Sequence, residues 1–280
     1  MVLLLLGVSA QRKVVAQALN CPSGTLPGDP GTIPGGFSGC LFLPVIDTPP
    51  SQAVFSAVPI MGEALDRPAA THPDINLAVR GYVPVTATLE LLDIDGPTDA
   101  DAPQLAGIFT PPRLPTFTAA YQVYDWDWVC GSDNNGCVGE LITQPEVTLI
   151  DVLVVPGEPI SIPLREPQIY EGGYKTLVLY AEAQRITLSY TREDNPAIGY
   201  MVHLENLRVD SNLVLLYQQL DTAGRTELPA LREGEPLGVA TSQPLKVAIR
   251  DTGSFLDPRS RKDWWMDYRQ LLGTQLLNNR

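Results

Sequence analysis

PLKVAIRDTGSFLDPRSRKDWW, residues 244–265, is the stretch that decides the expected fold of this 280-residue chain. A strand-like run ends at Arg250, and the Asp-Thr-Gly sequence that follows is typical of a hairpin turn. The hairpin leads to an Asp-Pro corner at Pro258, after which charged residues and two tryptophans crowd together. The stretch therefore predicts a strand, a hairpin and a corner, and its charged, aromatic end needs an explanation of its own.

The composition is that of a globular protein rich in β-strands. Apolar residues make up 44% of the chain and charged residues only 18%, which argues against wholesale disorder. The 26 prolines and 23 glycines break helices, so many short strands and turns are expected. A net charge of −13 disfavours binding to nucleic acid or to an anionic membrane.

The N-terminus, residues 1–18, has the features of an export signal. MVLLLLGVSA is a short apolar run with small residues at Val8 and Ala10, and a second small-x-small site lies at residues 16–18. The basic segment that normally precedes such a run is missing, so the signal is expected to begin upstream of Met1. The alternative is an apolar N-terminal strand in a cytosolic protein. No stretch approaches the length of a membrane span, and an extracellular or cell-surface location is expected.

Four cysteines support export. Cys21 and Cys40 flank a segment rich in proline and glycine, and Cys130 and Cys137 flank the turn sequence GSDNNG. An even number of cysteines in two local pairs predicts two disulfides and an oxidising compartment. Zinc is the alternative, but neither pair has the short CxxC spacing and the chain contains only two histidines.

Short apolar runs separated by turns divide the rest of the chain. A loop-rich arm, cross-linked by a disulfide between Cys21 and Cys40, is expected at residues 19–52. A β-rich domain follows at 53–140 and a second β domain at 147–280. The expected fold class is therefore mainly β, with two β-rich units.

Two helices are expected in the second β domain. Asp210 can cap the helical sequence SNLVLLYQQLDTA, and Gly224 can end it. The tail that follows Asp263 is predicted to form an amphipathic helix at the C-terminus.

Two motifs of the second β domain carry a family resemblance. The first is the turn GEPLG at residues 234–238. The second comprises these positions of the strand and hairpin: Leu245, Ile249, Arg250, Gly253, Leu256, Asp257 and Pro258. Both resemble the end of the lysostaphin-like zinc endopeptidases, which cut peptidoglycan cross-bridges and have a G-x-x-I-G turn before an H-L-H-F-E-I-R strand. The resemblance implies a barrel-sandwich-like domain with an inserted helix.

The residues that would bind zinc in such an enzyme are replaced. Where the family has two histidines in the strand, this chain has Pro244 and Lys246. Proline offers no ligand, and a protonated lysine repels a dication. HPDIN at residues 72–76 is similar to the family's H-x-x-x-D ligand pair, with Asn76 in place of the aspartate. The resemblance therefore implies a degenerate relative of the enzymes, without bound zinc.

Other catalytic sites have little support in the sequence. His203 lies in an alternating apolar run, and no G-x-S-x-G elbow accompanies either histidine. The cysteines are assigned to disulfides, and no nucleotide-binding fingerprint is present. The 32 acidic residues leave a carboxylate-dependent extracellular hydrolase as the alternative to a non-catalytic protein.

One acidic loop is a candidate for calcium, which prefers clustered oxygen ligands. A Gly-Pro turn in this loop is surrounded by Asp93, Asp95, Asp99 and Asp101. The loop lacks the spacing of an EF-hand, and a solvated acidic loop is the alternative. No other cofactor is expected.

Two tryptophan pairs are candidates for ligand binding. Trp126 and Trp128 alternate with aspartates; they could stack on sugar rings if exposed, and would belong to the core if buried. The second pair, Trp264 and Trp265, could bind a glycan or peptide together with Arg250. Alternatively they form a clasp, in which ion pairs and tryptophans hold the C-terminal helix against the strand.

The expected function is that of a secreted, non-catalytic protein of the cell envelope. It would bind cell-wall glycan or peptide, or assemble with itself as a structural component. Neither nucleic acid nor a membrane span is expected to be involved.

Overall fold

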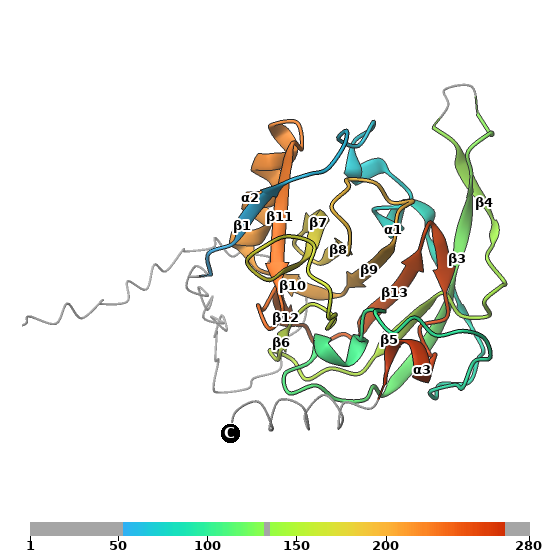
Figure 1. Cartoon of the computed structure of the whole chain (residues 1–280). Coiled ribbons are helices and arrows are strands. Elements are labelled where there is room, and N and C mark those ends of the chain that lie inside the picture. The colour runs from blue at the N-terminus through green and yellow to red at the C-terminus, as the bar shows by residue number, and fades with distance from the viewer. Residues whose placement is uncertain (1–52, 132–134, 267–280) are drawn as a thin grey trace, which may run out of the picture. The chain divides into compact units, whose positions relative to one another are not determined.

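Antiparallel strands dominate the computed structural model, which describes residues 53–131 and 135–266 (Figure 1). Nine strands form the main path of a large sheet in the order β1 (Ser56–Pro59), β11 (Glu227–Arg232), β7 (Tyr174–Glu182), β8 (Arg185–Ser189), β9 (Tyr200–Glu205), β13 (Leu245–Asp251), β5 (Leu149–Val152), β3 (Phe117–Asp127) and β2 (Tyr82–Val85). Two further strands complete its 11 strands: β14 (Ser254–Leu256) pairs with β13, and β4 (Cys137–Leu141) pairs with β3. The prediction of a mainly β chain is confirmed.

The remaining elements are small. A three-stranded sheet consists of β10 (Leu207–Val209), β12 (Gly238–Ala240) and β6 (Pro159–Ile160). The helices are α1 (Leu77–Arg80), α2 (Ser211–Thr222), α3 (Arg261–Trp264) and the 3-10 helices η1 (Ala69–Thr71) and η2 (Leu105–Ile108). No helix in the described part of the chain is long and apolar enough to cross a membrane.

The helix α2 and the β13–β14 hairpin form where the sequence predicts them. The Asp210 side chain accepts a hydrogen bond from the backbone N–H of Asn212 at 2.8 Å, which satisfies one of the free donors at the start of α2. In the hairpin, Asp251 pairs with Ser254, and the turn residue Gly253 has a φ of 84°. Of the C-terminal helix expected after Asp263, only residues 264–266 are described: Trp264 is the last residue of α3, and residues 265 and 266 are not helical.

The central strand β13 separates two apolar layers. Leu245, Val247 and Ile249 belong to the main core, whereas Ala248 belongs to a smaller cluster on the other face of the sheet. Alternation of side chains along a strand accounts for this division. The smaller cluster includes Leu77 of α1, so this helix packs against that face.

Strands from both of the expected β-rich units hydrogen-bond in the same sheet. Strand β3, in the range 53–140, pairs with β5, and β1 pairs with β11. Within the described residues the sheet ends at β1 and β2, which do not pair with each other, so it is open and not a closed barrel. The barrel-like form implied by the family resemblance is therefore not seen.

The charged, aromatic end of β14 forms a buried corner. Trp264 and Trp265 are only 4% and 1% exposed, and their indole N–H groups donate to the backbone carbonyls of Asp257 and Pro258, both at 2.8 Å. The Arg259 guanidinium, also buried, pairs with the Asp257 carboxylate at 2.7 Å. The corner thus has the ion pair and the shielded tryptophans expected of a structural clasp.

Candidate functional site

The face of the sheet that carries Lys246 bears a row of alternating charges. Across the neighbouring strands β8, β9, β13 and β5, the register aligns Arg185, Glu205, Lys246 and Asp151. The Lys246 ammonium is 2.6 Å from Asp151 and 3.7 Å from the ring centroid of Tyr121. Lys246 is 8% exposed, and its ion pair with Asp151 links the adjacent strands β13 and β5.

The other position compared with a zinc-binding histidine also has a structural role. The carbonyl of Pro244 accepts a hydrogen bond from Asn206 Nδ2 at 3.1 Å, which ties the loop after β9 to the start of β13. The Lys246 ammonium and the Pro244 carbonyl are thus both used in contacts within the protein.

The segment of residues 72–76 lies against the same face, although it is far from β13 in the sequence. Thr187 donates to the carbonyl of Ile75 at 2.6 Å and lies 3.0 Å from His203 Nδ1. Since the Thr187 proton is used, His203 Nδ1 is the donor in this second contact. Asp74 binds the buried guanidinium of Arg250 at 2.8 Å.

Both histidines are held in their neutral form by burial. Desolvation lowers the pKa of His72 to about 4 and the pKa of His203 well below its ordinary value. Asn76, which replaces the aspartate of the family motif, caps α1 by accepting from Ala78 N at 3.3 Å. The described residues contain no group of three or more His, Cys, Asp or Glu side chains that could hold a metal ion.

The two carboxylates of the charged row are likewise engaged. Asp151 accepts from the Tyr121 hydroxyl at 2.9 Å besides pairing with Lys246. Glu205 accepts from the Tyr82 hydroxyl at 3.1 Å, and burial raises the pKa of its carboxyl group. These contacts leave the carboxylates in structural roles.

The four aspartates considered for calcium are not gathered into a metal site. Asp99 accepts from the backbone N–H of Asp101 and from the Tyr200 hydroxyl, both at 2.9 Å. Asp93 pairs instead with Arg261 at 3.3 Å. Hydrogen bonds and an ion pair therefore hold this acidic loop to the surface of the protein.

Three of the residues considered for ligand binding are buried: Arg250, Trp264 and Trp265. Each already has hydrogen-bond partners inside the protein. A ligand could reach them only if this part of the chain opened, so we assign them to the fold.

The hairpin of β3 and β4 offers an exposed aromatic surface, and it extends away from the rest of the sheet (Figure 1). Its end is closed by the predicted disulfide Cys130–Cys137, which is confirmed. The other predicted disulfide, Cys21–Cys40, lies outside the described residues. The short disulfide loop limits how far the two strands can separate.

Gly136 allows the hairpin to position Trp126. This glycine has a φ of 72°, and a Cβ atom there would lie 2.4 Å from Trp126 Nε1. The indole N–H instead donates to the carbonyl of Asn135 at 3.1 Å. The Asn-Gly pair thus lets the indole ring pack directly on the backbone of the opposite strand.

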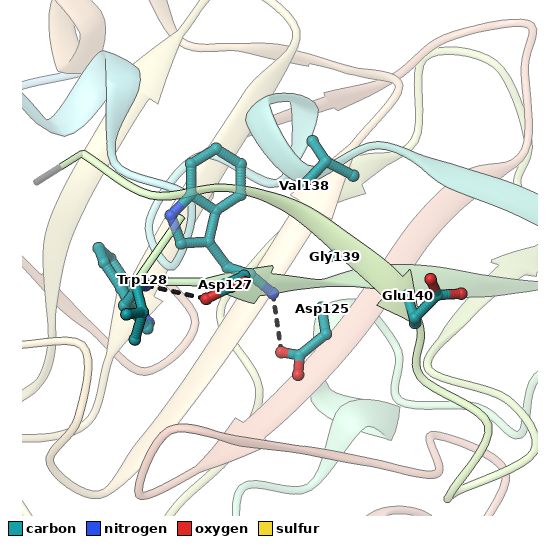
Figure 2. A pocket seen from close by; sticks show the side chains of 8 residues that line it. Asp125, Asp127, Trp128, Val138, Gly139 and Glu140 are labelled. Carbon is teal, nitrogen blue, oxygen red and sulfur yellow. Dashed lines mark hydrogen bonds between the residues drawn. The ribbon is translucent and has the colours of Figure 1, made fainter. Parts of the chain in front are cut away.

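Side chains of the hairpin line a hollow of about 650 Å³. Its polar and apolar lining includes Asp125, Trp126, Asp127, Trp128, Val138 and Glu140 (Figure 2). Trp126 is half-buried, whereas Trp128 is 40% exposed and the adjacent Val129 is 90% exposed. The sequence left two interpretations of this tryptophan pair, a surface for stacking on sugar rings or a part of the core. The exposure of Trp128 fits the first.

Contacts from the body of the protein fix the position of Trp128. The guanidinium carbon of Arg67 lies 5.0 Å from the centroid of the indole ring, and the His72 ring meets it edge-to-face at 5.7 Å. Trp126 also meets it edge-to-face, with centroids 6.3 Å apart. An exposed ring that is held in place loses little freedom when it binds a ligand.

The aspartates of the hollow are oriented by the backbone. Asp125 accepts from the N–H of Trp126 at 2.8 Å, and Asp127 accepts from the N–H of Val129 at 2.9 Å, as the dashed lines in Figure 2 show. Both side chains are exposed, and each retains acceptor capacity for a ligand. Glu140 is exposed as well and was not singled out from the sequence, since its place opposite Asp125 depends on strand pairing.

The chain matches no known protein-family model, no curated protein and no solved structure.

Proposed function

We propose that this protein is a non-catalytic extracellular protein that binds cell-wall glycan through the β3–β4 hairpin. The observation that carries this proposal is the hollow in which Trp128 is exposed beside three carboxylates: Asp125, Asp127 and Glu140. Sugar rings have apolar faces that can stack on indole rings, and hydroxyl groups that can donate to carboxylates. A site with a few oriented polar groups around an apolar surface suits such a ligand.

The location and the target are supported by separate features. The disulfide Cys130–Cys137 and the signal-like N-terminus favour an oxidising compartment outside the cell. The motif resemblance to peptidoglycan-cutting endopeptidases favours the cell wall as the target. Between the two wall components, the exposed indole ring favours glycan over peptide.

The charged row supports a non-catalytic role for the region that resembles the endopeptidases, and the carboxylates of the hollow are tested by the assay below. Lys246 is ion-paired with Asp151 where the resemblance would require a zinc ligand. A hydrolase that used two carboxylates would need both to face a substrate, and Asp151 and Glu205 are engaged with tyrosines and cations.

Sedimentation with purified, insoluble peptidoglycan tests the proposal. We expect Trp128→Ala to weaken binding about tenfold, because the ring supplies the main apolar contact surface. Leu215→Ala, which truncates an exposed apolar side chain on α2, is the matched control and should bind like the wild type.

Unchanged binding by Trp128→Ala would contradict the proposed binding site. Release of soluble fragments from the peptidoglycan by the wild-type protein would instead support the hydrolase alternative.

A further inference from the structure

We infer that the glycan recognised by the hairpin carries free amino groups, so that its sugars are cationic and not N-acetylated. This inference rests on the proposed function, since it specifies the ligand of the same hollow. Its basis is the charge of the lining, which contains three carboxylates and no basic side chain.

Strand pairing brings two of these carboxylates close together. Tyr124 pairs with Leu141 and Trp126 pairs with Val138, so β4 has one residue more than β3 between the two pairs. Gly139 and Glu140 therefore both lie opposite Asp125. Like charges on facing strands are unfavourable by themselves, and a cation between them would relieve this repulsion.

The carboxylates of the hollow are only partly neutralised by the protein. Arg80 lies 3.3 Å from Asp125 but is shared with the Asp74 carboxylate. Within the described part of the chain, Asp127 and Glu140 have no ion-pair partner. The net charge of −13 adds a long-range attraction for cationic ligands.

The aromatic part of the hollow already accommodates a cation. The Arg67 guanidinium lies over the Trp128 ring, which is the geometry of a cation–π contact. Because Arg67 occupies this contact, an ammonium group on a sugar would lie instead beside Asp127 and Glu140, whose carboxylates would balance its charge. A neutral acetamido group would not provide this interaction.

An amino sugar suits the hollow better than a lysine side chain does. Both ligands carry an ammonium group, but only the sugar also offers a ring face for stacking and hydroxyl donors for the aspartates. We therefore assign the ligand to the glycan class, and the experiment includes a lysine peptide as the competing source of ammonium groups.

Calorimetric titration of the full-length protein tests the inference with three probes. They are an oligomer of glucosamine, an N-acetylglucosamine oligomer of the same length, and an oligolysine peptide with the same number of amino groups. We expect the glucosamine oligomer to bind about tenfold more tightly than the acetylated one, because it adds contacts with two carboxylates. The difference should shrink at high salt.

Glu140→Gln removes one of these charges while keeping the shape of the side chain. It should weaken binding of the glucosamine oligomer about twofold to fivefold and that of the N-acetylglucosamine oligomer by a smaller factor, because the amide oxygen of Gln still accepts hydrogen bonds from sugar hydroxyls. The matched control is Asp95→Asn, which neutralises an exposed carboxylate outside the hollow and should change neither affinity.

The outcomes separate this inference from the proposed function. Equal affinity for both oligomers, lost in Trp128→Ala, would overturn the inference and leave the glycan-binding function intact. Tighter binding of oligolysine than of the glucosamine oligomer would overturn the choice of glycan. If neither oligomer bound and Trp128→Ala did not change peptidoglycan binding, both proposals would fail.

Discussion

The two tryptophan pairs of this protein occur in similar sequence contexts and lie in opposite environments. Trp264 and Trp265 follow a run of charged residues and are 4% and 1% exposed. Trp126 and Trp128 alternate with aspartates, and Trp128 is 40% exposed. Neighbouring charges therefore do not decide whether an aromatic side chain belongs to the core or to a surface.

The difference arises from what each segment packs against. The corner after β14 folds back on the protein, where Trp265 meets Phe117 of β3 edge-to-face with centroids 6.0 Å apart. The hairpin instead extends beyond the sheet, and only single side chains such as Arg67 and His72 reach Trp128. Both tryptophans of the corner are thus buried, whereas in the hairpin Trp126 is half-buried and Trp128 is exposed.

Among the variants that test the difference between the two tryptophan pairs, Trp265→Ala should lower the free energy of unfolding the most. Removing a fully buried indole ring loses its transfer free energy and leaves a cavity, which typically lowers the free energy of unfolding by about 3–5 kcal/mol. Trp128→Ala should lower it by about 1 kcal/mol, since this ring is 40% exposed and its removal leaves no closed cavity. Urea unfolding of both variants measures the contrast, and equal losses would show that the pairs do not differ in this way.

Removal of the hairpin disulfide should lower the free energy of unfolding by less than Trp265→Ala does. The Cys130→Ala/Cys137→Ala variant loses a constraint on a short loop, with a sequence separation of 7, which corresponds to about 2 kcal/mol. Because the loop belongs to the hairpin, peptidoglycan binding should weaken as well. Wild-type binding by this variant would show that the hollow does not depend on the disulfide.

The pH dependence of the free energy of unfolding, measured between pH 7 and pH 5, should give an effect no larger than that of the disulfide. Burial lowers the pKa of His72 to about 4, below the value of about 6.5 in the unfolded chain. The unfolded state therefore binds a proton more readily, so the contribution of His72 is complete above about pH 6.5 and is lost as the pH falls towards 4. Asp74 and Asp66 oppose this shift, and the value of about 4 already includes their contribution.

His72→Gln should remove this part of the pH dependence, as measured by urea unfolding at pH 7 and pH 5. His203 titrates in the same direction and remains in the variant, so the two pH profiles should differ without the variant becoming independent of pH. Identical profiles would show that His72 stays neutral in both states or is more exposed than the structure indicates.

The elements that could be predicted from the sequence are those decided by neighbouring residues. The cap at Asp210, the β13–β14 turn and the Cys130–Cys137 pair each depend on signals within a short stretch. The pairing of Ser56 in β1 with Ala230 in β11 has no such local signal, because many strands of similar composition compete for the same partner.

The candidate site, too, could be predicted from the sequence only where neighbouring residues decide the structure. Alternating tryptophans and aspartates marked the hairpin, but the exposure of Trp128 depends on which elements fail to cover it. The contribution of Glu140 depends on the irregular register between β3 and β4. Likewise, the partner of Lys246 is Asp151, which lies 95 residues away in the sequence.

The open ends of the large sheet have a consequence for how the protein behaves at high concentration. The outermost described strands, β1 and β2, have four residues each, and each contains a proline: Pro59 in β1 and Pro84 in β2. Proline cannot donate a hydrogen bond, and short strands offer little to a second chain, so both edges are poor templates for growth into fibrils. At these two edges the sheet is therefore protected against pairing with the sheet of a second molecule.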